Sequence, residues 1–187
     1  MDNNLLMNRT DALNLISEKL KNKNLIKHCL AAEACLRELA RHFGENEETW
    51  GLAGLLHDID YEETLNDPAH HGIIGGEFLE EKGISPEIVY AIKVHAGHFA
   101  PQSRLDWALF ATDPLTGLIV ASALMHPDKK LSSLDTDFVM RRFKEKRFAA
   151  GANREQILAC KNLGMELEQF IEICLRGMKS ISSDLGL

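Results

Sequence analysis

The sequence predicts an all-α protein, a compact multi-helix bundle with a C-terminal helical extension. Apolar residues recur at helical spacing along almost the whole chain, and the alternation typical of strands is rare. The composition, with 45% hydrophobic and 26% charged residues, is that of a globular protein with a core. A length of 187 residues suits one domain, so we expect a single domain over residues 1–187.

Helix boundaries are predicted from capping residues, glycines and prolines. Thr10 can cap the first helix, Gly44 ends the second, and Ser85 can cap the fifth. Pro114 is expected to interrupt a long apolar stretch. The expected helices cover about 11–20, 25–43, 47–58, 70–82, 86–95, 105–125, 138–146, 153–163 and 167–178.

Charge and cysteine usage exclude several classes of protein. The net charge of −7 and a pI near 5.6 do not favour a general nucleic-acid-binding surface, although a small anionic substrate is compatible with a bound cation. The four cysteines form no CxxC pair and are too sparse for a disulfide scaffold. No signal peptide is apparent, and no apolar run reaches the roughly 18 residues of a membrane span. We expect a cytoplasmic protein that does not bind membranes, and a homo-oligomer is compatible with the sequence.

Histidines and aspartates stand at the ends or breaks of different predicted helices. They are His28, the pair His57-Asp58, the pair His70-His71, His95 with His98, and Asp113. A bundle can bring such positions together, and facing helices often build metal sites. Imidazole and carboxylate groups suit divalent iron, manganese, cobalt, nickel or zinc, and we keep magnesium as a further candidate. The apolar residues before His57 place the pair at the end of a buried helix, where a bare Asp58 is costly without a partner.

The string LAGLLHDID, with His28 upstream and Asp113 downstream, resembles the HD-domain superfamily of metal-dependent phosphohydrolases, in particular its HDIG-type branch. The resemblance covers about residues 25–125, the expected metal-site core, and leaves a helical C-terminal subregion at about 132–187. It implies a first metal position formed by His28, His57, Asp58 and Asp113.

In branches of the superfamily with two metals, further histidines lie between the HD pair and the last aspartate. The strings HHGIIG and VHAGH match them at His71 and His95, so Asp58 would bridge two ions. The chain departs from the HDIG string by having Asp60 in place of glycine. It also lacks the HHE and GYP signatures, which does not favour a cyclic-di-guanylate substrate.

The resemblance implies hydrolysis of a phosphoester of a nucleotide or another small phosphorylated metabolite. A bound metal lowers the pKa of its water and so supplies a nucleophile, with His57 and Asp58 at the catalytic centre. His98 and Arg147 are weaker candidates for substrate contacts, Arg147 because it belongs to a basic run that is ordinarily a solvated helix face. Glu62 and Glu63 are weak candidates for a general base.

Two other functions stay open at this point. The same four histidines and two aspartates suit a di-iron oxygenase such as myo-inositol oxygenase, which resembles this superfamily. A non-catalytic HD module that binds a ligand or partner is the other alternative, although such a module would be expected to have lost ligands. The ordinary interpretation of His57 is a helix C-terminal histidine favoured by the helix dipole. His28 would then be an interfacial histidine of an amphipathic helix, and His71 and His95 would be ordinary helix-end residues. His42 is predicted to lie at the surface, far from His28 on the same helix.

Overall fold

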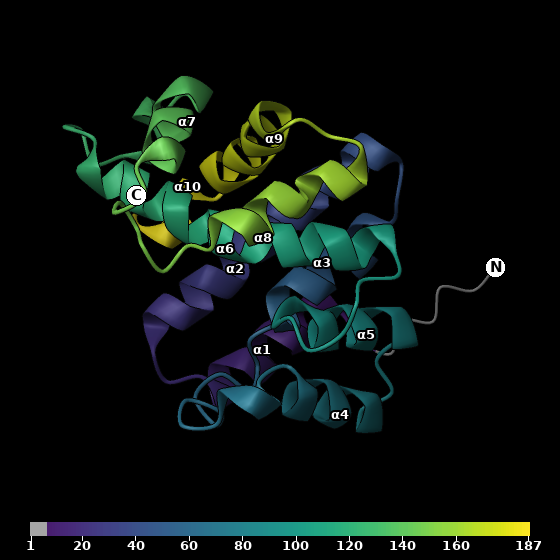
Figure 1. Ribbon diagram of the computed structural model, residues 1–187. Helices are drawn as coiled ribbons and strands as arrows, with labels where there is room; N and C mark the ends of the chain where they lie inside the picture. The colour runs from purple at the N-terminus through teal and green to yellow at the C-terminus, as the bar shows by residue number, and fades with distance from the viewer. Residues whose placement is uncertain (1–6) are drawn as a thin grey trace.

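The computed structural model describes residues 7–187 and confirms the all-α prediction, because that part of the chain contains no strand (Figure 1). Its α-helices are α1 (Arg9–Lys19), α2 (Lys23–Phe43), α3 (Glu47–Leu56), α4 (Ile73–Glu81), α5 (Pro86–His95), α6 (Arg104–Met125), α7 (Thr136–Lys144), α8 (Arg154–Leu158), α9 (Leu167–Ser180) and α10 (Ser182–Leu185). Short 3-10 turns cover Pro68–His70, Leu131–Ser133 and Ala159–Leu163.

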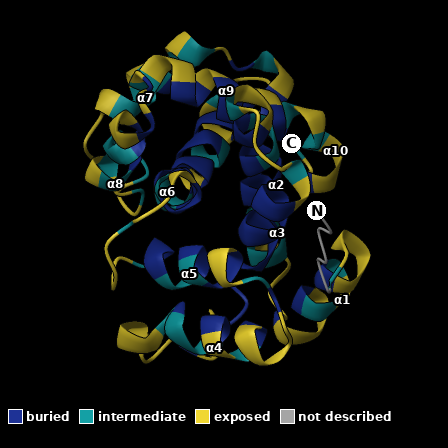
Figure 2. Cartoon of the chain, turned by 90° about the vertical axis from the view of Figure 1, so that its right-hand side faces the viewer, coloured by how far each residue is buried: buried dark blue, intermediate teal, exposed yellow. Residues whose placement is uncertain are grey.

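The bundle is built around α2, which packs against α3, α6 and α9. The helices α1, α4 and α5 lie on one side of α2 and α6 in Figure 1, and α7 and α9 lie on the other. Consecutive residues 31–36 of α2 are all buried, and Figure 2 shows α2 and α3 in the colour of buried residues over most of their length. A helix covered on several sides buries more than one apolar stripe, so α2 is the centre of the core.

Two glycines let other helices approach the backbone of α2 closely. A Cβ built on Gly54 of α3 would lie 2.7 Å from the backbone nitrogen of Glu33. A Cβ built on Gly177 of α9 would lie 2.5 Å from the carbonyl oxygen of Ala34. Both distances are shorter than a real side chain tolerates, so only glycine permits this packing of α3 and α9 on α2.

The predicted interruption at Pro114 is wrong, because α6 runs without a break from Arg104 to Met125. Proline has no N–H to donate to the carbonyl four residues earlier, which normally kinks or ends a helix. Here the neighbouring residues Ala111, Thr112, Leu115 and Thr116 are buried, so packing on both sides of the proline holds the helix together. By length and composition α6 is apolar enough to cross a membrane, but 56% of that window is buried inside the protein, as in a core helix.

Several predicted boundaries move. Asn8, rather than Thr10, caps α1 by accepting the N–H of Asp11. The segment expected to be helical from residue 70 begins its α-helix only at Ile73, because Gly72 takes a left-handed φ of 76°. Ser85 makes no capping bond, and its hydroxyl is buried without a partner among the described residues. The helices expected at 47–58 and 138–146 end at Leu56 and Lys144. Residues 1–6, which begin the segment where no signal peptide was expected, lie outside the described residues.

We predict that Gly54→Ala lowers the free energy of unfolding by about 1–3 kcal/mol, because the added methyl group forces α3 away from α2. Urea denaturation followed by circular dichroism measures the change. Gly117→Ala is the matched control, since a Cβ there meets nothing within 4 Å and alanine is the better helix former. Equal stability of the Gly54→Ala variant and the wild type would contradict the close-packing argument.

Candidate metal centre

Six residues singled out in the sequence meet at one point between the helices. His28 comes from α2, His57 and Asp58 from the end of α3, His71 from the turn before α4, His95 from the last residue of α5, and Asp113 from the middle of α6. His57, Asp58 and His95 are buried, and the other three are partly exposed. Elements far apart in the sequence therefore each contribute one or two polar groups to a single cluster.

The carboxylate of Asp58 is the centre of the cluster. Its Oδ1 lies 3.2 Å from Nε2 of His71, 3.4 Å from Nε2 of His95 and 3.5 Å from Nε2 of His57. Its Oδ2 lies 3.4 Å from Nε2 of His28. Oδ1 thus faces three imidazoles and Oδ2 faces the fourth.

The remaining distances divide the cluster into two halves. On one side, Nε2 of His28 lies 3.0 Å from Oδ1 of Asp113 and 3.1 Å from Nε2 of His57. On the other side, Nε2 of His71 lies 3.1 Å from Nε2 of His95. The groups His28, His57, Asp113 and His57, Asp58, His95 each have one ligand atom per residue within 4.8 Å of one another, close enough to hold a metal ion.

Each imidazole has its Nδ1 engaged away from the centre. The carbonyl of Gly54 accepts from Nδ1–H of His57, and the carbonyl of Ile92 accepts from Nδ1–H of His95, because a carbonyl can only accept. Engaged Nδ1 atoms leave Nε2 as the lone-pair donor that points into the cluster. This is the arrangement of histidines that bind metals.

Two further residues, which the sequence did not single out as site residues, hold the other two rings. Thr116 donates its hydroxyl proton to the carbonyl of Asp113, so its oxygen accepts from Nδ1–H of His28 at 2.9 Å. Oδ1 of Asp60 accepts from Nδ1–H of His71 at 3.0 Å. Two features of the sequence could have identified them. Thr116 follows Asp113 by one helical turn, and Asp60 stands where the HDIG string has glycine.

Oδ2 of Asp60 is also fully used. It accepts the backbone N–H of Gly72 at 2.8 Å and that of Gly75 at 2.7 Å. The side chain of Asp60 is buried and therefore ties the start of α4 to the loop after α3. The same carboxylate orients His71 and fixes the backbone that carries it.

The charges of the cluster favour a cation. Burial opposes ionisation of Asp58 and Asp113, but the neighbouring histidines outweigh it and lower the pKa of both carboxyls. Burial also opposes protonation of His28 and His71, yet hydrogen bonds to Asp113 and Asp58 raise their pKa values to about 9 and about 10. Burial lowers the pKa of His57 to about 4. The ionised carboxylates thus attract positive charge, which protons on two rings or a divalent metal can supply.

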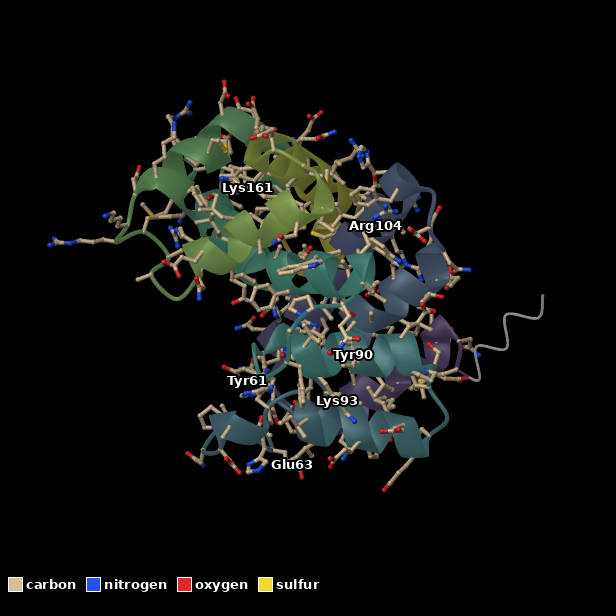
Figure 3. The ribbon with its side chains drawn as sticks, turned by 45° about the vertical axis from the view of Figure 1, so that its right-hand side comes forward. Tyr61, Glu63, Tyr90, Lys93, Arg104 and Lys161 are labelled. Carbon is tan, nitrogen blue, oxygen red and sulfur yellow. The ribbon has the colours of Figure 1, made fainter. Side chains whose placement is uncertain are left out.

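A cavity of about 450 Å³, here called the metal cavity, opens over the cluster. Its rim includes Tyr61, whose ring meets that of His71 edge-on and which lies at the edge of the molecule in Figure 3. It also includes Gln156 of α8, which donates to the carbonyl of His95 at 3.1 Å. The C-terminal part of the chain thus supplies one wall of a cavity whose floor comes from the preceding helices.

The other residues considered in the sequence lie outside this cavity. His98 and Arg147 are exposed and do not line it, so their role in substrate binding stays a prediction. The carboxylate of Glu62 accepts the backbone N–H groups of Lys21 and Asn22 instead of facing the cluster.

Two histidines considered in the sequence have other surroundings. His42 is exposed, as expected, and His70 is an exposed neighbour whose Nδ1 lies 2.7 Å from Oδ2 of Asp67. Lys93 of α5 is half-buried, with Nζ 3.2 Å from Oε2 of Glu80 in α4 (Figure 3).

Comparison with known proteins agrees with this site. The model of the HD domain family matches residues 25–126, more than half of the chain, and the chain therefore belongs to the HD-domain family. That superfamily consists generally of metal-dependent phosphohydrolases, and all six clustered residues fall within the matched range.

Its relatives include proteins of different lengths. The chain is 33% identical to ribonuclease Y of Desulfotalea psychrophila and 30% identical to that of Oleidesulfovibrio alaskensis, each over 95 residues that cover 51% of this chain. It spans only 18% of the length of these two proteins. It is 26% identical to an uncharacterized protein of Methanocaldococcus jannaschii over 166 residues, 84% of this chain and 95% of that protein.

We predict that Asp60→Asn weakens the binding of a divalent ion beside His71 and His95 by about tenfold to a hundredfold. Asparagine has one acceptor oxygen, so its NH₂ group must face either the His71 ring or the N–H groups of Gly72 and Gly75. Titration of chelator-treated protein with Mn²⁺, followed by calorimetry, measures the affinity of each ion.

Asp67→Asn is the matched control for this experiment, because Asp67 pairs only with exposed His70 among the described residues. Unchanged affinity in the Asp60→Asn variant would show that the Asp60–His71 bond does not support the site.

Proposed function

We propose that this protein is a metal-dependent phosphohydrolase that uses a dinuclear site to cleave a phosphoester of a nucleotide or another small phosphorylated metabolite. The observation that carries the proposal is the carboxylate of Asp58, shared by two groups of imidazoles whose Nδ1 atoms are all engaged elsewhere. Two oxygens on one buried carboxylate are what a bridge between two ions needs.

In this proposal His28, His57, Asp58 and Asp113 hold one ion, and Asp58, His71 and His95 hold the other. Four nitrogen and two carboxylate ligands fit divalent iron, manganese, cobalt, nickel or zinc. When bound, such ions supply a water of lowered pKa and neutralise charge on the phosphoryl oxygens. Backbone carbonyls, Thr116 and Asp60 keep the imidazoles aimed at the ions before substrate arrives.

The lining of the metal cavity supports a requirement for metal. Among its described lining residues there is no lysine or arginine, while Asp58 and Asp113 carry negative charge. Protons on His28 and His71 can only balance these two carboxylates, so a phosphate group meets no net positive charge at the cluster unless cations are bound. The site as built therefore suits an anionic substrate only together with its ions.

Two of the relatives are ribonucleases by name. The chain spans 18% of their length and carries a net charge of −7, so we propose a small substrate rather than RNA. The ligand set would also suit di-iron oxygen chemistry, and oxygen consumption without phosphate release distinguishes that reaction from hydrolysis.

We predict that Asp58→Asn and His57→Gln each lose bound metal and hydrolysis while the helical fold survives. Removing the shared carboxylate takes a ligand from both ions, and His57 lies within reach of both groups of ligand atoms. Elemental analysis of untagged protein purified without chelator, together with hydrolysis of a panel of phosphomonoesters, tests this, with His42→Ala as the control.

Two ions per chain in the wild type and retained hydrolysis in His42→Ala are the expected results. Full activity in either site variant would contradict the proposed centre. Two iron ions with oxygen consumption and no phosphate release would favour the oxygenase, and no ion after reloading would exclude a metalloenzyme.

Removal of metal should also lower stability. A ligand that binds only the folded state stabilises it by about 2.7 kcal/mol when its free concentration is about 100 times its Kd. We therefore expect chelator-treated protein to unfold at a lower temperature than protein reloaded with Mn²⁺. Differential scanning calorimetry measures the shift, and an equal shift in the Asp58→Asn variant would mean that the ions bind elsewhere.

A further inference from the structure

The metal cavity is one of three adjoining hollows on the same side of α2 and α6. The second, here called the middle hollow, has a volume of about 340 Å³ and shares His28 and Asp113 with the metal cavity. The third, here called the apolar chamber, has a volume of about 470 Å³ and shares His28 and Gly117 with the middle hollow. The shared residues place the middle hollow beside the metal cavity and the apolar chamber beside the middle hollow, with His28 bordering all three, and we call this arrangement the row of hollows.

The apolar chamber has the size and lining of a small-molecule site. Its volume lies within the range of about 300–1,000 Å³ that is usual for such sites. Ala31, Val120, Leu124 and Leu187 supply apolar surface, and the C-terminal described residues lie beside the end of α6 in Figure 1. The polar residues of this lining are Asn24, Lys27, His28 and Thr116, and the hydroxyl of Thr116 is bonded to His28.

Positive charge is scarce along the row. Lys27 is the one lysine or arginine among the described residues that line the three hollows, and its Nζ donates to the carbonyl of Leu185 at 2.8 Å. A second phosphate group beyond the metal centre would therefore meet mainly apolar surface and a single ammonium, one of whose three N–H donors is already used by a carbonyl. An uncharged organic group matches this lining better than a polyphosphate or a polynucleotide.

Gly117 forms the floor between the middle hollow and the apolar chamber. It lies inside α6, where glycine is among the least favourable residues. Its φ is not in the left-handed region, and a Cβ built on it meets nothing within 4 Å. Neither backbone conformation nor helix packing requires glycine here, and this exposed glycine leaves the surface between the two hollows uncovered by any side chain of its own.

The opposite wall of the middle hollow is held firmly. Residues Ala149, Gly151 and Ala152 form it, and the guanidinium of Arg154 donates to the carbonyls of Ala149 and Ala152, both at 2.7 Å. Arg154 also donates to the carbonyl of Phe148. The hydrogen bonds from Arg154 fix the backbone of this wall before a ligand binds. A ligand that packs against it therefore loses less binding free energy to the ordering of the protein.

We propose that the substrate is a phosphomonoester with an uncharged, mainly apolar organic part, which extends over Gly117 into the apolar chamber while the phosphoryl group lies in the metal cavity. This inference rests on the proposed function, because the metal centre fixes where the phosphoryl group binds. It narrows the substrate class to compounds with one phosphate group and an apolar arm.

Phosphonates test the proposal without catalysis, because their P–C bond is not a phosphoester. Metal-loaded wild type is expected to bind 4-phenylbutylphosphonate about tenfold or more tightly than methylphosphonate, since the arm buries apolar surface. Gly117→Leu should remove most of this preference and leave the affinity for methylphosphonate and the metal content unchanged. Gly117→Ala should have a smaller effect in the same direction.

Ala121→Leu is the matched control, because Ala121 lies in the same helix and lines none of the three hollows. If Gly117→Leu does not fold, Leu124→Glu replaces it. Leu124 is 52% exposed, so the carboxylate is tolerated by the fold but makes the chamber unsuitable for an apolar arm.

The outcomes separate this inference from the proposed function. The assignment of the chamber is overturned if wild type binds 4-phenylbutylphosphonate no more tightly than methylphosphonate. It is also overturned if the preference for 4-phenylbutylphosphonate survives Gly117→Leu. Both conclusions hold even if phosphomonoesters are hydrolysed. A preference that depends on Gly117, without hydrolysis of 4-nitrophenyl phosphate, would support the chamber and contradict the proposed function. Tighter binding of a short oligoribonucleotide than of 4-phenylbutylphosphonate would overturn the assignment in favour of an extended polyanion.

Discussion

The burial of one carboxylate, that of Asp58, is the constraint on which the rest of the site depends. Its side chain is 6% exposed and faces the Nε2 atoms of four histidines. A buried carboxylate without partners would be too costly to keep ionised. Four elements of the fold each deliver an imidazole to one of its two oxygens, and this arrangement is the basis on which we propose two adjacent cations.

The packing of the bundle makes this arrangement rigid. Gly54 lets α3 lie against the backbone of α2, and the carbonyl of the same glycine accepts from His57. Asp60 connects the loop after α3 to the turn before α4, and that turn carries His71. The same contacts that hold the helices together thus orient the ligands, and a metal centre needs such preorganisation because its ligands must not rearrange when ions bind.

The sequence predicted the helices and the six clustered residues well for a physical reason. Helical periodicity and glycine or proline signals are local, and an HD pair after an apolar helix is a specific pattern. The predictions that were wrong relied on local signals, which tertiary contacts can override. Pro114 does not break α6 because buried neighbours on both sides hold the helix, and Ser85 does not cap α5. The starts and ends of helices moved where a turn or a side chain offered a competing hydrogen bond.

By itself, the sequence determined the all-α class, the membership of His28, His57, Asp58, His71, His95 and Asp113 in one candidate site, and the kind of ion they suit. Only the tertiary structure decided that Asp58 is shared between two groups, that Asp60 and Thr116 hold the rings, and that a row of hollows leads away over Gly117. These features depend on distances between residues far apart in the chain, and local sequence patterns contain no information about such distances.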